Sequence, residues 1–156
     1  MSQLLYIVHN IRKNWGEKKI TQGVFLDVSS AFDKVWHSGL LAKLCQVGIE
    51  DKFYALMDSY LQDRKQIVVV NGCKSDILDV KAGVPQGSRL GPLLFLIYMN
   101  DIIDDIESDI LIFADDTSLF ATGSDPAETV EILNRDLEKI SIWATKWKVT
   151  FNAKKN

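Results

Sequence analysis

The stretch Asp109-Ile-Leu-Ile-Phe-Ala-Asp-Asp-Thr-Ser-Leu-Phe-Ala121 decides the fold more than any other part of the chain. Its runs of apolar and β-branched residues at 109–113 and 117–121 are typical of strands, and the break at 114–116 separates them. Two strands joined by so short a connection run antiparallel. The stretch therefore predicts a β-hairpin that carries Asp115 and Asp116 between its strands.

A second hairpin is predicted over Gln66–Lys81, because Asn71-Gly72 suits a two-residue primed turn between β-branched runs. A buried strand is expected over 23–28 and a closing strand over 149–151. Helices are expected over 2–14, 30–36, 38–47, 51–62, 92–106 and from Pro126, which follows a capping Asp125, to about Trp147.

Two hairpins without a regular alternation of strands and helices indicate an α+β fold rather than a doubly wound parallel sheet. We expect an antiparallel sheet packed on helices. The pattern contains no internal repeat, linker or domain boundary, so we expect a single domain over residues 1–156.

The composition is that of an ordinary globular domain, with 156 residues, 47% apolar and 25% charged. No apolar run approaches the roughly 18 residues of a membrane span, and no leader peptide is evident. Cys45 and Cys73 are too few for a disulfide framework or a four-ligand zinc site. We therefore expect an intracellular protein, nuclear or cytoplasmic, without a membrane or a disulfide-linked partner.

Acidic residues are concentrated in 91–128, which holds nine of them and no Lys or Arg, against a net charge of −3 for the chain. Such a block is a solvated acidic surface or a cation site, since clustered carboxylates repel one another until a metal lies among them. The charge pattern leaves both interpretations open.

Three carboxylates favour the cation site. Asp27 follows the apolar run Val24-Phe25-Leu26, and Asp115-Asp116 lie between two strands; as alternatives, all three are solvated turn residues. Gathered at the ends of adjacent strands, they would form an oxygen-rich site suited to Mg²⁺. Two such ions about 3.5–4 Å apart support an in-line phosphoryl displacement.

The segment Gly83-Val-Pro-Gln-Gly-Ser-Arg-Leu-Gly-Pro92 is a second candidate element of a site. Its glycines allow the backbone to approach a ligand closely, Pro85 stiffens it, and Gln86 offers uncharged donors and an acceptor. A plain connecting loop is the alternative.

These segments together resemble the palm motifs of reverse transcriptases from non-LTR, LINE-type retrotransposons, most of all the jockey-like branch. Segments 143–147 and 151–155 resemble the motif that follows, so the resemblance spans nearly the whole chain. The matching motifs are, in order, Phe25-Leu-Asp-Val-Ser-Ser-Ala-Phe-Asp-Lys-Val35, Gly83-Val-Pro-Gln-Gly-Ser88 with Gly91-Pro-Leu-Leu-Phe95, and Phe113-Ala-Asp-Asp116.

The resemblance implies an RNA-directed DNA polymerase, in which a primer 3′-hydroxyl attacks the α-phosphate of a dNTP. Its cofactors would be two Mg²⁺ ions, with Mn²⁺ as a substitute. Its partners would be an RNA template, a DNA primer and dNTP. Asp27 and Asp115 would be the main metal ligands, with Asp116 beside them, and Lys155 would protonate the departing pyrophosphate.

The resemblance also assigns nucleotide contacts. Phe32 would close off the sugar 2′ position, and Pro85, Gln86 and Gly87 would pack against the incoming nucleotide and template. Without the motif, Phe32 is read as a core aromatic and Lys155 as a solvated lysine. Separately, five basic residues are candidates for phosphate contacts: Arg64, Lys65, Lys74, Lys81 and Arg89.

The chain departs from the family at Arg89, where an aliphatic residue is usual, and at Ala153, where some members have Pro. By the family's pattern the domain is incomplete: part of the fingers is present, while the upstream fingers segments and the thumb are missing. We therefore expect weak or no polymerisation by the isolated chain.

Two other interpretations account for parts of the sequence. The first is a catalytically inactive, decayed remnant without a binding function. The second is a phospho-receiver domain, which is disfavoured because its acidic pair comes early in the chain, whereas here Asp27 precedes Asp115-Asp116.

Overall fold

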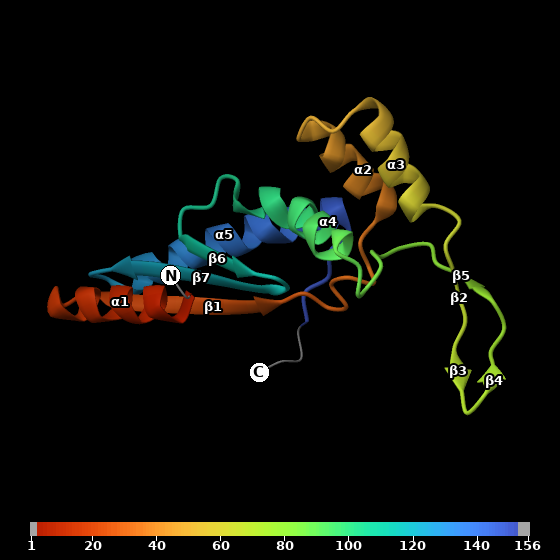
Figure 1. Ribbon diagram of the computed structural model, residues 1–156. Helices are drawn as coiled ribbons and strands as arrows, with labels where there is room; N and C mark the ends of the chain where they lie inside the picture. The colour runs from red at the N-terminus through yellow and green to blue at the C-terminus, as the bar shows by residue number, and fades with distance from the viewer. Residues whose placement is uncertain (1–2, 153–156) are drawn as a thin grey trace. The chain divides into compact units, whose positions relative to one another are not determined.

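The computed structural model describes residues 3–152 and divides the chain into two compact units (Figure 1). The first unit contains residues 3–29 and 101–152, and the second contains residues 30–100. No boundary of this kind is marked in the sequence pattern. The two units are described separately below.

The first unit is built on a three-stranded antiparallel sheet (Figure 1). Its strands are β1 (Ile20–Asp27), β6 (Asp109–Phe113) and β7 (Asp116–Gly123), and β7 lies in the middle. Strands β6 and β7 pair from Asp109–Phe120 to Phe113–Asp116, so the predicted hairpin is confirmed. The α+β class and the antiparallel sheet are confirmed with it.

Two helices flank this sheet. Helix α5 (Pro126–Trp147) contacts β7 and β1, and its N-terminus is capped as predicted, because the Asp125 carboxylate accepts a hydrogen bond from the Ala127 N–H at 2.9 Å. Its buried residues recur at helical spacing, as expected for a helix with one face on a sheet. Helix α1 (Gln3–Gly16) contacts β1.

The second unit contains three helices, namely α2 (His37–Gln46), α3 (Asp51–Leu61) and α4 (Leu90–Met99). Helix α2 contacts both of the others. One cation is buried here: the Lys43 ammonium donates a hydrogen bond to the Tyr98 carbonyl and lies 5.0 Å from the centre of the Tyr98 ring. A cation at the C-terminal end of α4 satisfies one of the carbonyls that a helix leaves unpaired.

The second predicted hairpin is present between α3 and the loop before α4, and it extends away from α3 in Figure 1. It has positive φ at both Asn71 (50°) and Gly72 (80°), as the Asn-Gly sequence predicts. The pairing is shorter than expected, because only β2 (Lys65–Gln66) with β5 (Leu78–Asp79) and β3 (Val69–Val70) with β4 (Cys73–Lys74) are joined.

Three expected elements differ in the structure. Residues 30–36 form turns rather than a helix, and the expected strand at 149–151 is reduced to a single bridge between Phe151 and Val28. The helix expected over 92–106 begins earlier, at Leu90, and its α-helical part ends at Met99; a 3₁₀ helix, η1 (Asn100–Ile103), follows it. None of the described helices has the length and apolar content that crossing a membrane requires.

Candidate functional site

Asp27 and Asp116 lie directly opposite each other at one end of the sheet, as the last residue of β1 and the first of β7. Paired residues in antiparallel strands have Cα atoms about 4.5–5.5 Å apart and side chains on the same face. The sheet register therefore places two carboxylates side by side. It does so although 88 residues separate them in the chain.

Asp115 joins this pair through the β6–β7 turn. Phe113 pairs with Asp116, which leaves only Ala114 and Asp115 in the turn. The Asp115 carbonyl accepts a hydrogen bond of 3.1 Å from the Val28 N–H, so the turn is held against the residue that follows Asp27. Ala114 has a φ of 54°, a conformation in which glycine is usual, and such strain is frequent at functional sites.

Segment 150–152 flanks Asp27 on its other side. The Asn152 N–H donates to the Asp27 carbonyl at 2.7 Å, and the Ser29 N–H donates to the Thr150 carbonyl at 2.8 Å. The Asn152 side-chain amide also lies 3.4 Å from an Asp27 carboxylate oxygen. Asp27 is thus held between β7 and this segment, which fixes its backbone.

These three carboxylates suit a hard cation by their chemistry, since Mg²⁺ takes oxygen ligands and commonly uses one or two carboxylates together with waters and substrate phosphates. The side chains of Asp27 and Asp115 are half-buried and that of Asp116 is exposed. Across residues 3–152, no three His, Cys, Asp or Glu side chains are arranged as a ready metal cage. The arrangement therefore fits an ion that is shared with a substrate better than a closed structural site.

The far end of β6 is anchored by a buried carboxylate, Asp136 of α5. Its oxygens accept hydrogen bonds from the N–H groups of Glu107 (3.1 Å) and Ser108 (2.7 Å). Burial alone raises the pKa of Asp136, but hydrogen bonds from Ser108, Glu107 and Lys139 outweigh it and hold the pKa below its ordinary value. This anchor fixes the start of the strand that ends at the Asp115 turn.

The glycine-rich loop belongs to the second unit, where segment 32–35 holds it. The Gly83 N–H donates to the Val35 carbonyl at 2.8 Å, and the Val84 N–H donates to the Phe32 carbonyl at 2.7 Å. Gly83 has a φ of 86°, and a Cβ there would lie 2.7 Å from the Asp33 carbonyl oxygen. Only glycine therefore fits at this position without moving the backbone.

Phe32 and the end of the loop also have defined surroundings. The Phe32 ring is half-buried and lies 4.9 Å, between ring centroids, from the buried ring of Phe95 in α4. The Ser88 hydroxyl donates to the Pro85 carbonyl at 2.8 Å and accepts from the Gly91 N–H at 2.9 Å, which pairs one N–H of the first turn of α4. Pro85, Gln86 and Gly87 therefore lie in a short loop before that helix, and the Ser88 hydrogen bonds hold its backbone.

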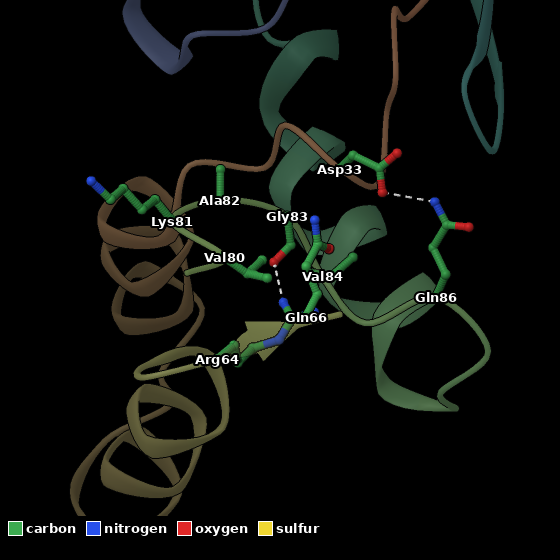
Figure 2. A pocket seen from close by; sticks show the side chains of 9 residues that line it. All are labelled: Asp33, Arg64, Gln66, Val80, Lys81, Ala82, Gly83, Val84 and Gln86. Atoms are coloured by element: carbon green, nitrogen blue, oxygen red, sulfur yellow. Dashed lines mark hydrogen bonds between the residues drawn. The ribbon is translucent and has the colours of Figure 1, made fainter. Parts of the chain in front are cut away.

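Three side chains hold this loop, and two of them, Asp33 and His37, were not singled out from the sequence; Figure 2 shows the contacts made by Asp33 and Arg64. Asp33 accepts a hydrogen bond of 2.8 Å from the Gln86 amide, Arg64 donates to the Gly83 carbonyl at 2.8 Å, and the His37 ring nitrogen Nε2 lies 2.8 Å from the same carbonyl. Since a carbonyl only accepts, Nε2 carries the proton. Asp33 lies within the 25–35 motif, and His37 lies just after it. Their role depends on contacts with Gln86 and Gly83, which are 53 and 46 positions away in the chain.

A cleft of about 680 Å³ opens beside this loop; its lining is mixed, with polar side chains from Arg64, Gln66, Asp33 and Gln86 and apolar ones from Val80, Ala82 and Val84 (Figure 2). Of the five basic residues expected to contact phosphates, Arg64 and Lys81 line the cleft. Lys65 and Lys74 lie on the exposed hairpin, and Arg89 directly precedes α4. Lys155 lies outside the described residues.

This arrangement places the structure in the class of polymerase palm folds. It is an antiparallel sheet packed on helices, with two carboxylates paired at the end of the sheet and a third in the adjoining turn. The model of the family described as reverse transcriptase (RNA-dependent DNA polymerase) matches residues 2–156, so the chain belongs to this family. The resemblance seen in the motifs is thereby confirmed.

Curated relatives come from the same group of mobile elements. The chain is 35% identical to the RNA-directed DNA polymerase from mobile element jockey of Drosophila melanogaster, over 98% of this chain and 18% of the relative. It is 32% identical to the probable RNA-directed DNA polymerase from transposon X-element of the same species, over 100% of this chain and 18% of that protein. The chain thus spans about a fifth of the length of these relatives.

Among solved structures, telomerase from Candida tropicalis, in complex with a fragment of telomeric RNA, has a similar fold. The TM-score is 0.63 at 13% sequence identity, over 99% of this chain and 29% of the telomerase chain. At this identity the likeness supports the fold alone, and it agrees with a partial polymerase palm.

Proposed function

We propose that this chain is the catalytic palm of an RNA-directed DNA polymerase, a nucleotidyltransferase that joins dNTP to a primer 3′-hydroxyl on an RNA template. The observation that carries the proposal is the pairing of Asp27 with Asp116 beside the Asp115 turn. Family membership supports the reaction, and the names of the jockey and X-element relatives support the template class.

Asp27, Asp115 and Asp116 are the residues that would hold two Mg²⁺ ions, or Mn²⁺ in their place. When bound, such ions supply charge neutralisation at the attacking and leaving oxygens. The chain's own contribution is a fixed pair of opposed carboxylates whose backbones are clamped by β7 and by segment 150–152. Such preorganisation reduces the rearrangement needed when charge develops in the reaction.

The second unit would supply contacts to the nucleotide. Gln86, flanked by Pro85 and Gly87, presents an uncharged amide that Asp33 orients. Phe32, supported from behind by Phe95, presents a half-buried ring that would exclude a sugar 2′-hydroxyl. Lys155 would protonate pyrophosphate. A DNA primer, an RNA template and dNTP are the partners in this scheme, and an intracellular location, nuclear or cytoplasmic, follows from them.

Single-nucleotide incorporation on a primed RNA template, with Mg²⁺ present, tests the proposal. The variants Asp27→Asn and Asp115→Asn remove charge with little change in shape, and Asp109→Asn at the opposite end of β6 is the matched control. We expect low but measurable incorporation by the wild type and by Asp109→Asn. We expect a loss of at least about 100-fold in the other two variants, because a metal ligand is removed.

A decayed remnant without function gives a different result. Such a chain would bind Mn²⁺ equally, or would incorporate nucleotide equally, in the wild type and in both site variants. Either outcome would overturn the proposed function.

A further inference from the structure

The hairpin of the second unit exposes an apolar strand to which the proposed reaction gives no role (Figure 1). Four consecutive β-branched residues follow Gln66, and between 44% and 61% of the surface of each is exposed: Ile67, Val68, Val69 and Val70. Single exposed apolar residues are ordinary, but a continuous apolar run on a strand marks a surface that associates. This strand is therefore a candidate interaction surface.

The rest of the second unit does little to stabilise this hairpin. The hairpin has two strands, joined through β2–β5 and β3–β4, and no described helix has extensive contacts with β3 or β4. A two-stranded hairpin is marginally stable in water, and a sheet generally requires a third strand or a covering helix. A further strand along one edge would supply what this hairpin lacks.

The backbone of strand 65–70 is oriented for such an addition. The Val68 carbonyl accepts from the Ser75 N–H at 2.9 Å, and the Val68 N–H donates to the Ser75 hydroxyl at 3.0 Å, so both groups point toward the other strand of the hairpin. Backbone groups alternate in direction from one residue to the next along a strand. Those of Ile67 and Val69 therefore point toward the outer edge, which no described strand pairs.

The opposite edge of the hairpin is protected against pairing. Strand 73–79 carries three charged side chains, Lys74, Asp76 and Asp79. It also contains a bulge, because residues 67 and 68 of the first strand lie opposite residues 75–77 of the second. Charges and bulges both prevent the pairing of one edge with another. The run 66–72 has no charged residue, so the open edge is that of strand 65–70.

We propose that two copies of this chain associate through this edge, with the two 65–70 strands side by side and antiparallel. The uncharged run 66–70 pairs with itself over its whole length when Val68 lies opposite Val68 of the second copy. Ile67 then lies opposite Val69 of the second copy, and the outward backbone groups of these residues form the hydrogen bonds between copies. This association is independent of the proposed function.

Charge and symmetry favour a second copy as the occupant of this edge. In this register Lys65 lies opposite Asn71 of the second copy, which places the two Lys65 residues about 20 Å apart along the strands, well beyond the Debye length of about 8 Å. The resulting four-stranded sheet has a protected strand 73–79 at each outer edge, so association ends at a dimer. Because the paired strands are short, the dimer is weak and depends on concentration.

Sedimentation velocity of the whole chain, from micromolar to millimolar concentration, tests the proposal. The wild type is expected to show an equilibrium between monomer and dimer. Val69→Pro removes an N–H from the open edge and is expected to weaken the dimer at least about tenfold, since two hydrogen bonds between copies are lost. Lys74→Pro is the matched control, because Lys74 lies opposite Val69 in the hairpin and its N–H points toward the protected edge. It is expected to associate as the wild type does.

A pair of charged variants tests the register. Val68→Lys and Val68→Asp each place like charges directly opposite one another and are expected to abolish the dimer. An equimolar mixture of the two places opposite charges together and is expected to restore it, which a misfolded variant could not do. Ile77→Lys adds the same charge at an exposed apolar position of the other strand and is expected to leave the dimer intact.

Several results would overturn the proposal. A wild type that stays monomeric at millimolar concentration lacks the interaction, and one that forms assemblies larger than a dimer lacks the protected edge. Equal weakening by Val69→Pro and Lys74→Pro, or by Val68→Lys and Ile77→Lys, would show that the open edge is not the contact. A mixture of the Val68 variants that associates no better than either variant alone would contradict the antiparallel register.

Discussion

Asp27 and Asp116 face each other across β1 and β7 as a directly paired couple of like charges. Such a pair destabilises an antiparallel ladder by a few tenths of a kcal/mol to about 1 kcal/mol. The sheet retains it at the end where the Asp115 turn is clamped to Val28. A cation between these groups converts the repulsion into attraction, and this relationship generates the first prediction.

Asp116→Asn is expected to raise the free energy of unfolding without metal by about 0.2–1 kcal/mol, because one of two opposed charges is removed. Millimolar Mn²⁺ is expected to raise the melting temperature of the wild type and to have a smaller effect on the variant. Thermal unfolding with and without Mn²⁺ measures both effects. A variant less stable than the wild type in the absence of metal would contradict this interpretation.

Gly83→Ala is expected to destabilise the chain by about 1–3 kcal/mol, because alanine at a φ of 86° is strained and its Cβ would meet the Asp33 backbone at 2.7 Å. Substitutions at two other glycines distinguish the effect of positive φ from that of the close contact. Gly72→Ala has positive φ but open space and is expected to cost about 1 kcal/mol, whereas Gly16→Ala has neither constraint and is expected to cost nothing. Urea denaturation of the three variants checks the order, and equal losses would refute it.

Asp136→Asn is expected to lower the free energy of unfolding at pH 7 by about 1–3 kcal/mol, because the buried amide cannot replace the carboxylate that accepts from Glu107 and Ser108. The folded-state pKa of Asp136 is lowered, so its contribution is complete above the unfolded value of about 3.9. It is lost as the pH falls through the folded-state value. Urea denaturation at pH 7 and pH 3 should show the difference from wild type shrinking in acid; a difference independent of pH would contradict the assignment.

Asp33→Ala is expected to release the Gln86 side chain, since its amide then loses the 2.8 Å acceptor. The measurement is the side-chain amide resonance of Gln86 in a nitrogen–proton NMR spectrum, which should move toward the position of a solvated glutamine. Asp33→Asn retains an oxygen acceptor, so the Gln86 amide resonance should stay close to its wild-type position. Asp58→Ala on α3 removes a similar carboxylate–amide contact, with the C-cap residue Gln62, and should leave Gln86 unchanged.

Local sequence signals predicted the elements whose hydrogen bonds are local. The 109–121 hairpin, the Asn71-Gly72 turn and the Asp125 cap were all foreseen, because each depends on neighbouring residues. The pairing of Asp27 with Asp116 agrees with the expectation that carboxylates at the ends of adjacent strands meet at one edge. Their role as metal ligands stays a prediction.

Some of the secondary-structure predictions are wrong where backbone groups bond to residues far away in the chain. Residues 30–36 have apolar spacing that suits a helix, but the carbonyls of Phe32 and Val35 accept from the loop at Val84 and Gly83 instead, and Ser30 has a φ of 53°. Helix α4 starts at Leu90 rather than Pro92; its N-cap residue, Arg89, makes no side-chain cap hydrogen bond, and the Gly91 N–H of its first turn donates to the Ser88 hydroxyl. The orienting bond from Gln86 to Asp33 joins residues 53 positions apart, which no periodicity reveals.

Paramagnetic broadening by Mn²⁺ tests the metal site most directly, through backbone amide resonances of the whole chain. At substoichiometric Mn²⁺ we expect signals from Val28, Asp116 and Thr117 to disappear first. The signal of Asp109, four residues from the turn and so roughly 13 Å along β6, should persist longer. Asp27→Asn should abolish the effect. Broadening centred elsewhere, or unchanged in Asp27→Asn, would contradict the claim that these three carboxylates share divalent ions.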